Sequence, residues 1–464
     1  MKRGSPMKRT EPFVVFNLFL SVLTALMILG CSSESLYSIS GQVTSGGSAL
    51  SGVTMTLIGP AGRTATTDTN GNYSFGDMPI GIYTLTPSLM GYTFLPPAKS
   101  VYLDGINATA FNFSAIIGGR LATAAHTFYV KGDATLWGWG SNNSGQIGDG
   151  TTTDRANRVQ VTTLSGMKTV DTGEDHTVAL KSDGTVWTWG NNSNGQLGNG
   201  TTTSSSVPIQ ATSLSNVINV TAGYKFTVAL KSDGTVWAWG INSSGQLGNG
   251  TTSDSSVPVQ VTGLSTAATA VSAGFDHVLS LQNDGTVWTW GSNSKGQLGN
   301  GTTTDSSVPV QVNGVSSIIA IAAGNDFSLA LRNTLFTIWA WGSNSKGQLG
   351  NGTTTDSATA VNVSGLALVT AIAAGDDHAV SLKSDGTVWT WGDNSNGQLG
   401  NGTATGSTTP VQVTGLSGSV AVAAGRDDSA VMKTDNTLWA WGNNSNGQLG
   451  DGTTTDRWTP VQAP

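Results

Sequence analysis

Residues 176–200 read HTVALKSDGTVWTWGNNSNGQLGNG, and close copies of this stretch recur along the chain. A Trp-x-Trp-Gly motif precedes a Gly-Gln-Leu-Gly motif in every copy, and these Trp pairs hold fourteen of the 15 tryptophans. A fixed period of about 50 residues is typical of propellers and solenoids. The second motif, with Ile replacing Leu once, begins at seven positions separated by 50 or 51 residues: Gly145, Gly195, Gly245, Gly296, Gly347, Gly397 and Gly447.

Each copy has the pattern of four β-strands. In the second copy, residues 176–180 and 185–189 alternate between apolar and polar, and a Ser-Asp-Gly turn separates them. Asp-Gly between two such runs predicts a tight hairpin. Trp187 and Trp189 are two residues apart, so their indoles point to one face of the strand. Four strands in each of seven repeats predict an all-β fold with a seven-bladed β-propeller over residues 116–464, with indoles between the blades.

The repeats resemble those of the regulator of chromosome condensation family. The matching motifs are Ala-Ala-Gly-x-x-His, Leu-Lys-Ser-Asp-Gly-Thr-Val-Trp-x-Trp-Gly, Gly-Gln-Leu-Gly-Asn-Gly and Pro-Val-Gln-Val. The first repeat departs most, because Arg158 replaces the Pro and no Ala-Ala-Gly precedes His126. We expect the ring to close by pairing residues 460–462 with a strand near residues 116–119.

Residues 37–115 predict a separate β-sandwich. Short alternating runs are separated by turn residues, as in Tyr37–Val43 and Val53–Leu57. The order of these motifs resembles the carboxypeptidase regulatory-like (transthyretin-like) domain of bacterial surface proteins, for which a spacer role is expected. The Asp-Thr-Asn-Gly sequence at 68–71 predicts a tight turn, with a calcium loop as the alternative.

The N-terminus has the pattern of an export signal. Four basic residues precede an apolar stretch at 13–29, which is short for a membrane span. Ile-Leu-Gly-Cys at 28–31 resembles the lipobox of bacterial lipoproteins, which implies a signal peptide over 1–30, a lipid on Cys31 and a tether over 31–36. An ordinary signal peptide or signal anchor with a chance Cys is the alternative. By resemblance, Ser32 after the Cys implies outer-membrane sorting in a diderm bacterium.

Composition excludes several classes of protein. Only 11% of residues are charged, and the net charge is −7. Removing residues 1–30, with four basic residues and one acidic, would change −7 to −10. A negative chain of this kind is not expected to bind nucleic acid. One Cys cannot form an intramolecular disulfide.

The two residues after each Ala-Gly or Thr-Gly vary from repeat to repeat, whereas the framework around them stays constant. By repeat symmetry these pairs are expected to form a ring on one end of the propeller, with seven acids and two bases. We hypothesise that this ring contacts a partner; solvated, variable loop tips are the alternative interpretation. The candidate binding residues are Glu174, Asp175, Tyr224, Lys225, Phe275, Asp276, Asn325, Asp326, Asp376, Asp377, Arg426 and Asp427.

No catalytic, metal or cofactor site is predicted. The four histidines occupy one repeat position, at 126, 176, 277 and 378, where the other repeats have Phe226, Phe327 and Asp428. Phe at two of these positions favours a structural role over a metal site. The Gly-rich loops lack the Lys-Ser/Thr pair and helix of a phosphate site, and no Ser/His/Asp set stands out from the repeats.

These observations predict a non-enzymatic binding scaffold, exported and anchored to the cell envelope through acylated Cys31. Its partner would be an extracellular or periplasmic protein, or a polysaccharide. The alternatives are an inhibitor of an extracellular enzyme and, least favoured, a guanine-nucleotide exchange factor. Export would separate the chain from a cytoplasmic GTPase, and the even repeat spacing leaves no room for the inserted wedge of the family's exchange factors.

Overall fold

The computed structural model describes residues 36–45, 48–89, 92–95, 99–117 and 121–463, and every regular element in these ranges is a β-strand. The all-β prediction is therefore confirmed for this part of the chain. The expected signal peptide and Cys31 lie outside the described residues. Among the described residues, no helix has the length and apolar character needed to span a membrane.

The N-terminal strands form two sheets. In one, the strand order is β2-β1-β9-β7 and β5 also pairs with β1; in the other it is β4-β3-β6-β8. Alternation buries one face of each strand, as at Met55 and Leu57 in β3, in a shared apolar core. The strands are β1 (Tyr37–Ser45), β2 (Ser48–Ala49), β3 (Thr54–Ile58), β4 (Arg63–Thr66), β5 (Asn72–Met78), β6 (Gly81–Ser88), β7 (Tyr92–Leu95), β8 (Lys99–Leu103) and β9 (Phe113–Ile117).

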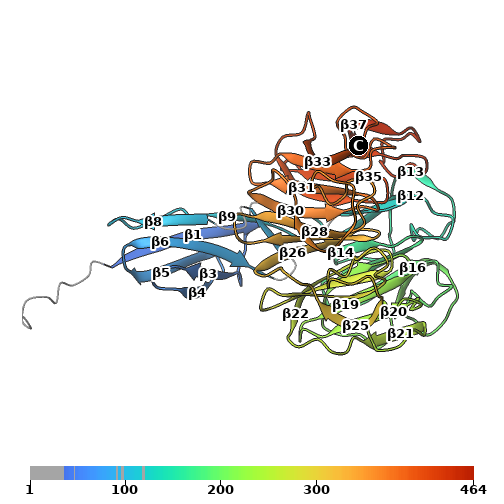
Figure 1. The fold of residues 1–464 in the computed structure, drawn as a ribbon, viewed down its shortest axis with the longest axis horizontal. Helices are drawn as coiled ribbons and strands as arrows, with labels where there is room; N and C mark the ends of the chain where they lie inside the picture. The colour runs from blue at the N-terminus through green and yellow to red at the C-terminus, as the bar shows by residue number, and fades with distance from the viewer. Residues whose placement is uncertain (1–35, 46–47, 90–91, 96–98, 118–120, 464) are drawn as a thin grey trace, which may run out of the picture.

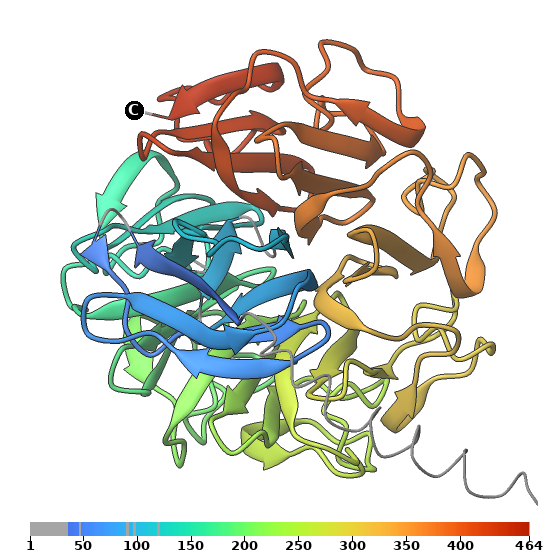
Figure 2. The same ribbon diagram turned by 90° about the vertical axis from the view of Figure 1, so that its left-hand side faces the viewer.

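Seven four-stranded antiparallel sheets follow, one for each repeat, and surround a central axis (Figure 2). We call them repeat sheets 1 to 7. Their innermost strands contact one another in a closed ring. From sheet 1 to sheet 7, these inner strands are β10 (Leu121–Thr123), β14 (Met167–Thr172), β18 (Val217–Ala222), β22 (Ala268–Ala273), β26 (Ile318–Ala323), β30 (Val369–Ala374) and β34 (Ser419–Ala424).

The other strands of each sheet follow outward in chain order. The second strands are β11 (His126–Val130), β15 (His176–Lys181), β19 (Phe226–Lys231), β23 (His277–Gln282), β27 (Phe327–Arg332), β31 (His378–Lys383) and β35 (Asp428–Lys433). The third strands are β12 (Leu136–Gly140), β16 (Val186–Gly190), β20 (Val236–Gly240), β24 (Val287–Gly291), β28 (Thr337–Gly342), β32 (Val388–Gly392) and β36 (Leu438–Gly442). The outermost strands are β13 (Arg155–Gln160), β17 (Ser205–Gln210), β21 (Ser255–Gln260), β25 (Ser306–Gln311), β29 (Ser357–Asn362), β33 (Ser407–Gln412) and β37 (Arg457–Ala463).

The second tryptophan of each motif joins neighbouring sheets. Trp189 is fully buried, and its Nε1 donates to the carbonyl oxygen of Gln146 in the preceding sheet at 2.8 Å. A Cβ at Gly148 would lie 2.7 Å from that Nε1, so the loop needs glycine to pass this close to the indole. Trp187 packs against the same cluster while partly buried. The Gly-Gln-Leu/Ile-Gly motif thus forms the surface against which the indole of the next repeat packs.

The expected closure of the ring is wrong. Residues 460–462 belong to β37, which pairs with β36 of its own sheet, whereas sheet 1 uses β10 to β13 alone. The first and last sheets therefore share no strand. Side-chain bonds join them instead: Thr127 Oγ1 and Trp139 Nε1 both donate to the carbonyl of Gln448 at 2.8 Å. We call this junction the seam.

The sandwich extends from one face of the ring (Figure 1). In Figure 1 the sandwich lies on the left of the ring, and the connection from β12 to β13 lies on the right. β12 ends at Gly140, which pairs with His126 at the start of β11. The varied pairs directly precede the residues equivalent to His126, so they lie at the face opposite the sandwich. The two ends of the ring are consequently different surfaces.

Candidate functional site

The first members of the six varied pairs surround one mouth of the central channel, where a cavity of about 380 Å³ lies. In repeat sheet 1 the equivalent residue is Ala124. We call these six the mouth residues: Glu174, Tyr224, Phe275, Asn325, Asp376 and Arg426.

A chain of main-chain hydrogen bonds links the mouth residues. The amide of Glu174 donates to the carbonyl of Tyr224 at 3.2 Å, and the amide of Tyr224 donates to the carbonyl of Phe275 at 3.1 Å. The same bond repeats from Phe275 to Asn325, from Asn325 to Asp376 and from Asp376 to Arg426 at 3.2–3.4 Å. Because each backbone is bonded to the next, the side chains are displayed on a continuous rim.

Two groups of side chains divide the rim. On one side, the rings of Tyr224 and Phe275 stack with centroids 3.9 Å apart and planes 16° apart, and Lys225 Nζ lies 4.9 Å from the Tyr224 centroid. On the other side, Arg426 Nη1 lies 2.7 Å from Glu174 Oε1, and its Nε lies 3.3 Å from Asp376 Oδ2. The Arg426 side chain thus crosses the seam from sheet 7 to sheet 2.

Burial makes the carboxyl groups of the varied pairs, both at the mouth and between the sheets, weaker acids than usual. It raises the pKa of Asp376 to about 7, against the lowering effect of Arg426 and with the help of nearby carboxylates. Burial also raises the pKa of Asp276 to about 6, and the charge of Asp326 adds to this shift. The negative charge of this face therefore changes near neutral pH.

The second members of the varied pairs lie between sheets. Three of them accept close hydrogen bonds from the buried Gln Nε2 of the preceding sheet: Gln246 to Asp276 at 2.9 Å, Gln297 to Asp326 at 2.9 Å and Gln348 to Asp377 at 2.8 Å. Asp175 and Asp427 make the same contact at 3.4 Å, and only Lys225 differs. Five of these six candidates thus help to hold sheets together, and the mouth residues are the better binding candidates.

The histidines also connect sheets. Each is fully buried, and each Nε2 lies 2.9–3.0 Å from a hydroxyl of the next sheet, such as Thr177 for His126. That hydroxyl donates its own proton to a Gln carbonyl, so the histidine Nε2 must be protonated and donate to the hydroxyl oxygen. Burial lowers the pKa of His126 to about 3, which keeps the ring neutral. No group of three or more His, Cys, Asp or Glu side chains in the described residues could hold a metal ion.

The family of the repeats follows from comparison with known proteins. The RCC1-like domain family matches residues 172–464, more than half of the chain. The chain belongs to this family. The regulator of chromosome condensation (RCC1) repeat matches residues 133–180, and the carboxypeptidase regulatory-like domain matches residues 38–113. The resemblances expected for the repeats and for residues 37–115 are confirmed.

Individual relatives match parts of this RCC1-like chain. Human Protein RCC2 is 42% identical over 82 residues, 17% of this chain and 16% of RCC2. The human E3 ubiquitin-protein ligase HERC2 is 35% identical over 115 residues, 24% of this chain but 2% of HERC2. The chain therefore aligns with only a small fraction of the length of these relatives.

Solved structures of similar fold include human WBSCR16 and Prp20p from Saccharomyces cerevisiae. WBSCR16 has a TM-score of 0.65 and 23% identity, covering 71% of this chain and 94% of its own. Prp20p has a TM-score of 0.62 and 21% identity, covering 73% of this chain and 87% of its own. At these identities the likeness shows the fold, a β-propeller.

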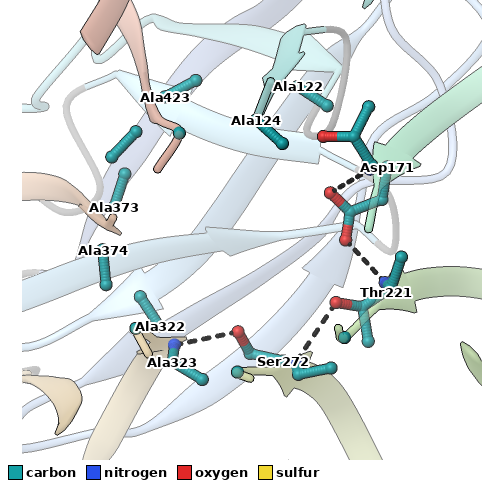
Figure 3. A pocket seen from close by; sticks show the side chains of 18 of the residues that line it. Ala122, Ala124, Asp171, Thr221, Ser272, Ala322, Ala323, Ala373, Ala374 and Ala423 are labelled. Atoms are coloured by element: carbon teal, nitrogen blue, oxygen red, sulfur yellow. Dashed lines mark hydrogen bonds between the residues drawn. The ribbon is translucent and has the colours of Figure 1, made fainter. Parts of the chain in front are cut away.

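Sequence reasoning missed a polar ladder in the wall of the RCC1-like channel. Asp171 Oδ2 accepts from the amide of Ala222 at 2.9 Å, Thr221 Oγ1 from Ala273 at 3.2 Å and Ser272 Oγ from Ala323 at 3.1 Å (Figure 3). Alanine occupies the equivalent positions 322, 373 and 423. One wall of the channel is consequently polar, and the other is lined by methyl groups.

A second missed signal was a pairing between successive repeats. Wherever one repeat has His, the next has Thr or Ser after its own equivalent position. Wherever it has Phe, the next has an apolar residue, as in Phe226 with Val278 and Phe327 with Ala379, which pack in shared clusters. Comparison of neighbouring repeats could have found these contacts.

This pairing predicts a coupled effect of two substitutions. Ser328→Val alone should cost about 1–3 kcal/mol of unfolding free energy, because His277 Nε2, 2.9 Å from Ser328 Oγ, would lose its partner. In the His277→Phe background, the same change should cost much less, since it recreates the Phe226–Val278 pair. Urea denaturation of the four variants measures the coupling; additive costs would contradict the pairing.

Proposed function

We propose that this chain is a cell-envelope lipoprotein in which a seven-bladed propeller, on a sandwich spacer, binds a partner protein through the mouth residues. Residues 1–30 would be removed, and lipid on Cys31 would anchor the mature chain to the cell envelope, in the outer membrane if the cell is diderm. The scaffold is non-catalytic and uses neither cofactor nor nucleic acid. Residues 37–115 form the spacer, and residues 116–464 the propeller.

One observation carries the proposal: the mouth combines aromatic and charged groups on a bonded rim. Tyr, Trp and Arg dominate binding energy at protein interfaces, and ordered side chains lose less entropy on binding. The stacked rings of Tyr224 and Phe275 and the ion pair of Arg426 with Glu174 supply side chains of these types that are already ordered. The channel wall behind the rim is lined mainly by aliphatic and short polar side chains.

The position of the sandwich supports the same function. The spacer lies on one side of the ring (Figure 1), and the strand connections beside the mouth residues lie on the opposite side, so the mouth is directed away from the spacer. With the lipid on the N-terminal side of the spacer, the mouth would be presented away from the membrane. A protein partner could then reach the rim without passing the bilayer.

Removal of the aromatic pair should abolish partner binding. In crosslinking capture from intact cells with tagged full chain, Tyr224→Ala/Phe275→Ala should lower recovery of the partner about tenfold or more. The matched control is Val207→Ala/Val257→Ala, which changes exposed residues on the outer strands β17 and β21. Equal recovery with both variants would contradict the mouth as the binding surface.

The identity of the captured molecule separates the alternatives. A hydrolase whose activity falls on binding would instead indicate an inhibitor, and a polysaccharide would replace the protein partner in the proposal. Nucleotide exchange on a captured GTPase would support the exchange-factor alternative.

A further inference from the structure

Exposed large apolar side chains of the sandwich gather at one end. Ile106 is 72% exposed and Ile82 is 67% exposed. Clusters of this kind on an otherwise polar protein mark contact surfaces. We call the cluster the apolar tip; it comprises Leu36, Ile58, Ile80, Ile82, Tyr102 and Ile106, which are all the exposed large apolar residues among the described residues of the sandwich.

Strand registers place these residues together. Ile82 pairs directly with Tyr102, and Gly81 pairs with Leu103 at the ends of β6 and β8. Ile58, the last residue of β3, pairs with Thr84 two residues farther along the same face of β6. The loops at 79–80 and 104–107 leave from these strand ends, and they carry Ile80 and Ile106.

The chain enters the sandwich at the same end. Tyr37 pairs with Met78, the last residue of β5, so Leu36 lies beside the loop that carries Ile80. The amide of Ser38 donates to Asn107 Oδ1 at 2.9 Å, which brings the Ile106 loop to the same place. The tip is the end of the sandwich that faces away from the repeat sheets (Figure 1).

The tip carries little charge. Arg63 donates to the carbonyls of Gly76 and Asp77 at 2.7 and 3.2 Å, and the side chains of Asp77 and Asp104 add two negative charges. No basic cluster is present among these tip residues, so attraction to anionic lipid headgroups cannot drive an interaction here. The tip therefore presents mainly apolar surface to its surroundings.

We infer that the apolar tip rests in the interfacial layer of the membrane that holds the lipid on Cys31. This rests on the proposed acylation. Five residue steps separate Cys31 from Leu36, and at about 3.3–3.6 Å each they span at most about 18 Å. The bilayer surface must then lie within that reach of the tip, at the level where tyrosine rings are enriched and exposed apolar side chains can be buried.

The consequence is a fixed orientation rather than a free tether. With the tip at the bilayer, the long axis of the sandwich points outward, and the repeat sheets lie at the far end of the molecule with the face opposite the sandwich directed away from the bilayer. A flexible tether alone would allow the propeller to lie on the membrane with its mouth covered.

Hydrogen exchange tests the contact. The chain from Cys31 onward can be coupled through its only thiol to a maleimide phospholipid and bound to phosphatidylcholine vesicles. Amides at 80–82 and 104–107 should then exchange about fivefold or more slowly than in the uncoupled protein. In lipid-coupled Ile80→Ser/Ile106→Ser the protection should disappear, whereas Val207→Ser/Val257→Ser should retain it. These four residues are exposed, so all variants should melt like the parent. Unchanged exchange at both loops would overturn the inference.

A separate measurement tests the acylation on which the inference rests. Radiolabelled palmitate should enter the parent in cells but not Cys31→Ala. Absence of label from the parent would refute the lipid anchor whatever the vesicles show. Label on the parent with unprotected loops on vesicles would leave the anchor standing and refute the tip contact alone.

Discussion

Trp189→Ala is expected to lower the free energy of unfolding by about 3–5 kcal/mol, the range for removal of a buried large aromatic side chain. The indole is fully buried between repeat sheets 1 and 2. Its loss would leave a cavity beside Gly148 and would leave the Gln146 carbonyl without the Nε1 donor at 2.8 Å. Both effects act on the interface that joins two sheets.

Trp187→Ala is the matched control, because the same residue type lies two positions earlier in the same strand. Its indole is only partly buried, and Nε1 donates to Thr185 Oγ1 within its own hairpin at 3.2 Å. We expect a cost of about 1–2 kcal/mol. Urea denaturation followed by far-UV circular dichroism measures the unfolding free energy of both variants. Equal losses would show that packing of the Trp189 indole between the sheets is not the main source of stability.

The seam is expected to become less stable as pH rises, because Asp428 is held in its protonated form. The Thr127 hydroxyl donates its proton to the Gln448 carbonyl, so in the 2.8 Å contact between Thr127 and Thr123 the Thr123 hydroxyl must be the donor. Thr123 then has no proton left for its hydrogen bond with Asp428. Two bonds need two protons, and a protonated carboxyl supplies the second. Complete burial, which disfavours the charged carboxylate, also raises the pKa of Asp428 well above its usual value.

The sign of the pH effect follows from linkage. An acid with a raised folded-state pKa stabilises the fold fully below its unfolded pKa, and this stability is lost as pH rises toward the folded pKa. One such proton changes the unfolding free energy by about 1.4 kcal/mol per pH unit in that window. Asp428→Asn should keep a donor for Thr123 and remove this contribution.

The measurement is the difference in pH slope between the parent and Asp428→Asn, from urea denaturation between pH 5 and pH 9. Subtraction is needed because Asp376 and Asp276 also have raised pKa values. Asp435→Asn serves as the control: Asp435 lies in an exposed hairpin where a hydrogen bond from Thr437 lowers its pKa. Parallel pH curves for the parent and Asp428→Asn would contradict a protonated Asp428.

Repeat symmetry was enough to locate the candidate residues at one end of the ring. It could not show which of them line the mouth and which lie between the sheets. Equivalent positions in equivalent sheets must form a ring, so the sequence placed all twelve residues on one face. Which member of each pair faces the channel depends on the path of the chain after each inner strand. The structure shows that Asp326 bonds to Gln297 of the neighbouring sheet, whereas Asn325 lines the mouth.

Periodicity was enough to predict the all-β propeller and the family of both segments, because a repeating hairpin with regularly spaced Trp and Gly can be recognised from local sequence. How the ends of the ring meet became apparent only in the folded chain. The seam brings together Thr123 and Asp428, and Arg426 and Glu174, which are hundreds of residues apart. Local patterning carries no information on such contacts, because they depend on how seven small rotations between sheets add up to a closed circle.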